Sequence, residues 1–160
     1  MHNNFEGHTA PLRDDDLSQR PGTVDWRSAL LGAAVGVSGP AYFGTLITDA
    51  TLWVFTGQGR SVREAYAYIG QYSVTVPAVL NFVAEALCAF GCGWVSAAYG
   101  KGRAMTQGLA AGLLATSFYL VMLASPETPT MSFVLAAVPL LVTMLGSVIG
   151  AWVFSRRSPD

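Results

Sequence analysis

Residues 28–55 read SALLGAAVGVSGPAYFGTLITDATLWVF and contain one ionisable residue, Asp49. A helix needs about 20 mainly apolar residues to cross roughly 30 Å of hydrocarbon. This stretch exceeds that length, so it predicts a membrane-spanning helix that tilts or ends among the lipid headgroups. A helix on the surface of a soluble protein would instead carry Lys and Glu along one face.

Three further apolar stretches follow the first, separated by short polar or charged segments. They predict spans over about residues 73–99, 104–124 and 131–154. Only 12% of the 160 residues are charged, about half the share that is usual in soluble domains. The sequence therefore predicts an all-α integral membrane protein, with a four-helix bundle formed by residues 26–155.

The basic residues predict the orientation of this bundle. Cytoplasmic segments of membrane proteins carry an excess of Lys and Arg. An inside N-terminus leaves only Arg60 and Arg63 outside and keeps the other basic residues in the cytoplasm: Arg13, Arg20, Arg27, Lys101, Arg103, Arg156 and Arg157. We therefore expect both ends in the cytoplasm. Residues 1–25 are polar without helical periodicity, which predicts a flexible tail, and residues 156–160 form the C-terminal end.

The connection between the first two spans contains a helix-start signal. Ser61-Val62-Arg63-Glu64 fits a capping box, in which the serine caps the helix and the glutamate reaches back to it. Aromatic and aliphatic residues follow as far as Gly70. This pattern predicts a short amphipathic helix on the outer membrane surface. Such a helix anchors a loop, covers the mouth of a cavity or meets a partner, and loop anchoring is the favoured interpretation.

Each span carries small residues at spacings of four. Lipid gives helices no hydrophobic reason to associate, so close packing of backbones at small residues supplies much of the attraction. The pattern predicts one compact antiparallel bundle and indicates packing rather than a particular function. The glycines expected at helix contacts are Gly32, Gly36, Gly44, Gly93, Gly108, Gly112, Gly146 and Gly150.

Two acidic residues lie inside predicted spans, Asp49 in the first and Glu85 near the middle of the second. Ionisable groups in hydrocarbon are costly and usually functional. Tyr42 and Thr45 recur with Asp49 at helical spacing, and Asn81 shares a helix face with Glu85. We expect these two polar stripes to form a seam that leads from the outer surface toward the membrane centre.

Three hypotheses explain the acids. In the first, Glu85 is protonated and donates a structural hydrogen bond. In the second, Glu85 and Asp49 form a proton or cation site in a small transporter or channel. Alternatively, the acids pair with a basic residue of another subunit and so specify assembly. The small size of the bundle leaves little room for an enclosed pathway, which favours assembly over transport.

Several functional classes lack their sequence signals. The spans contain no histidine, and Cys88 and Cys92 do not have the spacing of a metal site. No phosphate-binding loop follows a strand, and no Ser/His/Asp set is able to meet in one leaflet. The net charge of −1 gives no indication of a nucleic-acid partner. We therefore expect no enzymatic activity, no metal and no cofactor.

Residues 89–112 read AFGCGWVSAAYGKGRAMTQGLAAG. A glycine-rich helix end runs into a basic turn at Lys101 and Arg103, and the next helix opens with Gly108 and Gly112. This pattern resembles one in small four-span bacterial inner-membrane proteins of uncharacterised function. The resemblance covers about a quarter of the chain and implies a bacterial inner membrane and a four-helix fold. It implies no activity and does not include Asp49 or Glu85.

The leading hypothesis is a small accessory, scaffold or assembly subunit in the lipid bilayer, bound to a larger membrane protein or to copies of itself. The size of the chain, the glycine stripes and the unpaired acids favour it. The alternative is a minimal proton- or cation-coupled transporter or channel that uses Glu85 together with Asp49 and Asn81.

Overall fold

A computed structural model describes residues 23–70, 75–124 and 133–157. Within these ranges the chain is entirely helical, and its elements are α2 (Trp26–Gly57), α3 (Val62–Ile69), α4 (Val76–Tyr99), α5 (Ala104–Leu123) and α6 (Phe133–Arg157). All except α3 are long and apolar enough to cross a membrane, so the predicted all-α membrane architecture is confirmed. The predicted tail up to residue 22, the first residues of the second and fourth predicted spans, and residues 158–160 lie outside the described residues.

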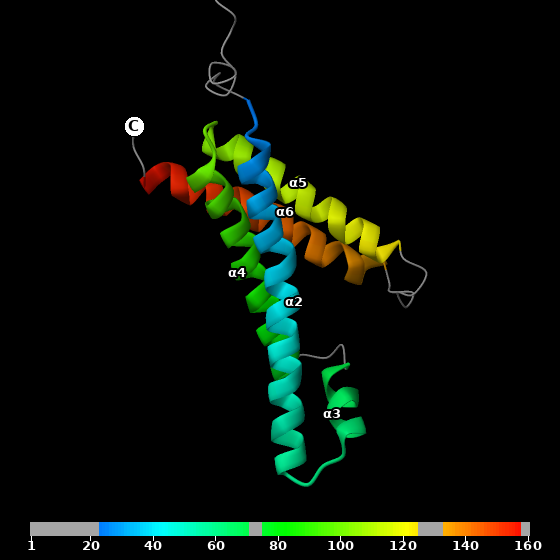
Figure 1. Ribbon diagram of the computed structural model, residues 1–160. Coiled ribbons are helices and arrows are strands. Elements are labelled where there is room, and N and C mark those ends of the chain that lie inside the picture. Colours follow the sequence, from blue (N-terminus) through cyan, green and yellow to red (C-terminus); the bar gives the residue numbers. More distant parts are fainter. Residues whose placement is uncertain (1–22, 71–74, 125–132, 158–160) are drawn as a thin grey trace, which may run out of the picture.

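The helices are arranged around α4, which packs against both α2 and α6 (Figure 1). α2 and α4 run side by side over most of their length. α5 and α6 lie against each other and cross this pair near one end, then diverge from it. We call the end with the α4–α5 turn at residues 100–103 the hairpin end, and the opposite end the α3 end.

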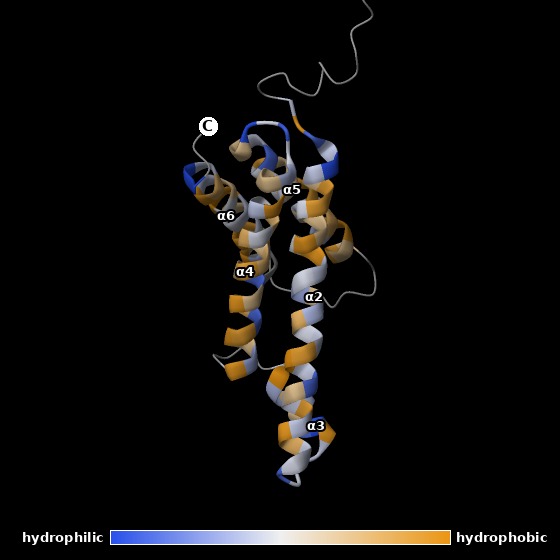
Figure 2. Cartoon of the chain, turned by 60° about the vertical axis from the view of Figure 1, so that its left-hand side comes forward, coloured by the Kyte–Doolittle hydropathy of each residue, from blue (hydrophilic) through white to orange (hydrophobic). Residues whose placement is uncertain are grey.

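Most of the core lies toward the hairpin end and is built from small residues. Its apolar members are alanines and cysteines, among them Ala29, Cys92, Ala111 and Ala151. Large apolar side chains such as Leu113 and Leu145 are exposed instead, as expected for surfaces that face lipid acyl chains. In the hydropathy colouring, apolar residues recur along each of the long helices (Figure 2).

The two ends differ in how α2 is covered. The buried residues of α2 all lie between Ser28 and Gly36, and none of the residues from 37 to 57 is buried. At the α3 end, α2 contacts α4 and the short helix α3, whose Ala65 is buried. Both hydrogen bonds of the capping box at Ser61 and Glu64 are present, which explains why α3 begins at Val62.

Candidate functional site

Glu85 lies on α4, roughly 14 Å along the helix from Val76 at 1.5 Å per residue. It lies one helical turn closer to the α3 end than Ala89, which packs against Gly146 of α6. The side chain is half-buried, and its Oε1 atom is buried without a hydrogen-bond partner among the described residues. Leaving a buried polar group unsatisfied costs about 1–3 kcal/mol, and more when the group is charged. Glu85 is therefore the residue whose environment most needs an explanation.

One polar residue of α5, Tyr119, lies close to Glu85. The hydroxyl of Tyr119 donates a hydrogen bond to the carbonyl oxygen of Gly36 at 3.3 Å, and it is close enough to Glu85 to interact with it electrostatically. Thr116 shares the helix face of Gly112, and its hydroxyl is the second buried oxygen without a partner in the described part of the chain. We call Glu85 and Tyr119 the polar pair.

The predicted stripe on α4 turns toward the interior. Asn81 is half-buried near Gly44 of α2, where its Oδ1 lies 3.6 Å from the place of an added Cβ atom. Cys88, Cys92 and Ser96 continue the stripe and are buried. A line of polar and weakly polar groups therefore follows one face of α4 from Asn81 through Glu85 into the core.

The predicted stripe on α2 lies on an exposed face. Tyr42, Thr45 and Asp49 all have exposed side chains. The Thr45 hydroxyl donates to the carbonyl oxygen of Ala41 in its own helix at 3.0 Å, and Asp49 makes no ion pair or side-chain hydrogen bond within the described ranges. The structure brings Asn81 and Glu85 onto one interior face but does not bring Asp49, Tyr42 or Thr45 to them.

The eight glycines expected at contacts between helices lie in two kinds of surroundings. A Cβ atom added to seven of them would collide with or press tightly on a neighbouring helix. At Gly93 it would fall on the backbone of Ser147, and at Gly150 on the carbonyl of Phe90. Gly44 is the exception, with ordinary van der Waals space. The tight positions are Gly32, Gly36, Gly93, Gly108, Gly112, Gly146 and Gly150.

Sequence reasoning missed Gln107, the largest fully buried side chain described. In the amide orientation that satisfies both ends of the side chain, its oxygen accepts from the backbone N–H of Asp25 at 2.7 Å, and its nitrogen donates to the Asp25 carbonyl and the Ser28 hydroxyl at 3.2 Å each. Ser96 donates to the Gln107 carbonyl at 3.0 Å. The sequence signal for this residue was a single amide side chain among the small residues at the start of α5. Gln107 joins α2, α4 and α5 at the hairpin end and closes the bundle there.

Neither cysteine is in a disulfide, and the described residues include no group of three or more His, Cys, Asp or Glu side chains placed to hold a metal ion. No protein-family model, curated protein or solved structure matches the chain. The chemistry of the site therefore rests on its own geometry. That geometry is an acidic side chain near the middle of a spanning helix, with one oxygen that no described residue satisfies.

Proposed function

We propose that this chain is a non-enzymatic assembly subunit of a membrane complex, and that Glu85 pairs with a basic residue on a transmembrane helix of a partner protein. The observation that carries the proposal is the buried, unsatisfied Oε1 atom of Glu85. A carboxylate at mid-membrane depth costs about 2.5–3.5 kcal/mol on insertion scales. A cation from a partner would offset that cost.

The sequence favours a partner of a different kind over a second copy of the chain for this contact. The basic residues of α2 and α6, Arg27, Arg156 and Arg157, lie at the hairpin end of these helices, and α4 and α5 contain no Lys, Arg or His. A second copy therefore has no cation at the depth of Glu85.

The orientation proposed for this subunit has both termini in the cytoplasm of a bacterial cell, with α3 on the outer surface. Its support is the collection of basic residues at the hairpin end, against Arg60 and Arg63 at the α3 end. Green fluorescent protein fused after Asp160 should fluoresce, and alkaline phosphatase inserted after Gly59 should be active. The opposite pattern would reverse the orientation.

The assembly role is tested by purifying the chain from its source membrane in native nanodiscs and measuring the intact assembly by mass spectrometry. We expect a stoichiometric larger partner with the wild type and its loss with Glu85→Gln, which keeps the side-chain size and removes the charge. Asp49→Asn is the matched control, since it neutralises the other intramembrane acid, which is exposed. A lone monomer, or equal partner recovery from both variants, would refute the proposal.

A transporter or channel is the second candidate, and the interior polar stripe from Asn81 through Glu85 to Ser96 is the observation that favours it. Its test is proton or cation flux into liposomes containing the purified chain alone. Flux that Glu85→Gln abolishes, without a change in oligomeric state, would support this candidate. The assembly proposal expects no flux from the isolated wild-type chain.

A further inference from the structure

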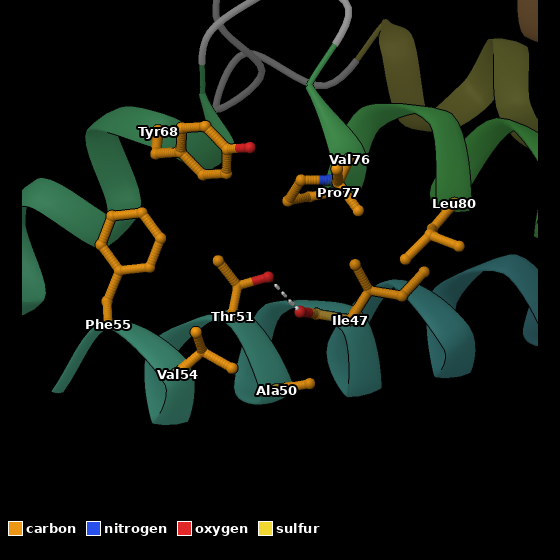
Figure 3. A pocket seen from close by; sticks show the side chains of 9 residues that line it. All are labelled: Ile47, Ala50, Thr51, Val54, Phe55, Tyr68, Val76, Pro77 and Leu80. Atoms are coloured by element: carbon orange, nitrogen blue, oxygen red, sulfur yellow. Dashed lines mark hydrogen bonds between the residues drawn. The ribbon is translucent and has the colours of Figure 1, made fainter. Parts of the chain in front are cut away.

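At the α3 end, residues of α2, α3 and α4 line an apolar cavity of about 270 Å³ that is open on one side (Figure 3). Ile47, Val54 and Phe55 of α2 line one side, and Tyr68 of α3 and Pro77 and Leu80 of α4 line the other. At roughly 30 Å³ per molecule, water would need about nine molecules to fill the cavity, and water requires polar partners that apolar walls do not provide. The cavity therefore suits an apolar occupant.

The polar atoms of the lining have limited hydrogen-bonding capacity. The hydroxyl of Thr51 donates to the carbonyl oxygen of Ile47 at 2.7 Å (Figure 3), so its hydrogen is already used. The ring of Tyr68 packs against that of Phe55 with 5.2 Å between centroids. None of the described residues that line the cavity is charged. A ligand inside it has to be apolar over the buried part of its length.

Arg60 lies beside this cavity, and two interactions with Phe55 keep it there. The backbone N–H of Arg60 donates to the carbonyl oxygen of Phe55 at 3.0 Å, and the Arg60 guanidinium lies 5.1 Å from the centre of the Phe55 ring. Gly59, with a φ of +74°, supplies the left-handed backbone that this turn requires and that other residues adopt only with strain. Arg60 is thus fixed next to an aromatic residue of the cavity lining.

We propose that this cavity binds one acyl chain of an anionic phospholipid whose phosphate pairs with Arg60. The depth agrees with a lipid, because Ile47 lies ten residues from Gly57, about 15 Å along α2, so the cavity reaches from the headgroup region into the acyl region. Arg60 and Arg63 are the cations of the described part of the α3 end, and they complement an anionic headgroup. The site is independent of whatever Glu85 binds.

The test uses purified, delipidated protein in mild detergent with equal concentrations of phosphatidylglycerol and phosphatidylcholine that carry the same acyl chains. Intact mass spectrometry then counts the retained lipids. The wild type should retain one lipid and prefer phosphatidylglycerol about fivefold, the ratio that one basic residue near an anionic headgroup produces. Retention of no lipid, or equal retention of the two, would overturn the proposal.

Two variants locate the lipid, each with a matched control. Ala50→Phe fills the cavity and should reduce retention of both lipids at least fivefold, whereas Ala41→Phe, another exposed alanine of α2 outside the cavity, should not. Arg60→Gln should remove the preference and keep some binding. Arg156→Gln removes a guanidinium 3.9 Å from the centre of the Trp152 ring at the hairpin end and should keep the preference.

Either unchanged retention in Ala50→Phe or an unchanged preference in Arg60→Gln would overturn the proposed site. Arg60 is exposed, so its replacement tests the headgroup contact without dependence on core packing. Ala50→Leu, a smaller filling substitution, serves if the phenylalanine variant does not yield a monodisperse protein.

Discussion

The half of the bundle at the hairpin end and the half at the α3 end belong to the same apolar helices, yet they are packed in different ways. At the hairpin end, glycines such as Gly93 and Gly108 bring the helices into close contact, and Gln107 joins three of them with hydrogen bonds. At the α3 end, α2 has no buried residue beyond Gly36, and an apolar cavity opens under α3.

This difference shows that the apolar character of the helices places them in the membrane, whereas the positions of small residues determine where the helices pack against each other. Lipid and apolar side chains are nearly equivalent environments for a leucine, so packing is decided by how closely backbones approach. The polar pair of Glu85 and Tyr119 lies near the limit of the close-packed region. The closely packed half is suited to stability, and the other half offers the surfaces that we propose for a partner and a lipid.

The largest expected effect comes from separating the helices of the close-packed half. Gly93→Val should lower the free energy of unfolding by about 3 kcal/mol or more, at the upper end for overpacked cores, because its Cβ atom would fall on the backbone of Ser147. Thermal unfolding in detergent, followed by tryptophan fluorescence, measures the change. Many such variants should fail to accumulate in the membrane at all.

Gly44→Ala is the control from the α3 end, since a Cβ atom there has ordinary contact with Asn81. Its unfolding free energy should stay within about 0.5 kcal/mol, or rise by up to about 1 kcal/mol from higher helix propensity. Comparable losses in the two variants would mean that the two halves are equally well packed, which would remove the distinction between them.

The second effect concerns the polar groups of the two halves. Gln107→Ala should cost about 2 kcal/mol, because it empties a fully buried site and leaves the backbone N–H of Asp25 without its partner. Thr45→Ala at the α3 end should cost under about 0.5 kcal/mol, since its exposed hydroxyl bonds only within its own helix. Chemical unfolding of both variants in the same detergent makes the comparison. A small loss in Gln107→Ala would show that the amide does not stabilise the hairpin end.

The sequence predicted the four spans, because long apolar runs have no other stable solution, and it selected glycines that prove to lie between helices. It did not predict the partner of each glycine, since Gly93 and Gly108 both pack against Ser147 and only the three-dimensional arrangement brings them together. Helical geometry alone predicts that the polar stripe of α2 lies away from the buried face of this helix. Tyr42 comes six residues after the buried Gly36, which places the two about 120° apart around a helix of 3.6 residues per turn.

The hydroxyl and carboxyl groups of the two stripes differ in what they indicate about burial, for a chemical reason. Serine and threonine hydroxyls bond to carbonyls one turn back in their own helix, as Ser38 does to Ala34 at 2.6 Å, so they indicate little about which face is buried. A carboxyl group has no such partner within its own helix. Glu85 and Asp49 both indicated a special environment by this reasoning, yet only Glu85 has a buried oxygen without a partner, whereas Asp49 is exposed.

The smallest expected effect separates assembly from a purely structural role of Glu85. In the isolated chain, Glu85→Leu should raise the free energy of unfolding by about 1 kcal/mol, because it removes a buried oxygen without a partner. This corresponds to about 2–4 °C in the unfolding midpoint of a chain of this length. Glu85→Gln, which keeps a polar group at the site, is the control and should change the midpoint less.

The same Glu85→Leu variant should lose its partner in the source membrane, so that stability in isolation and assembly in the membrane change in opposite directions. A structural hydrogen bond from Glu85 predicts the reverse for the isolated chain, a lower midpoint after substitution by leucine. Opposite signs in the two measurements would tie Glu85 to a partner, because a group retained only for the fold of its own chain does not destabilise that fold.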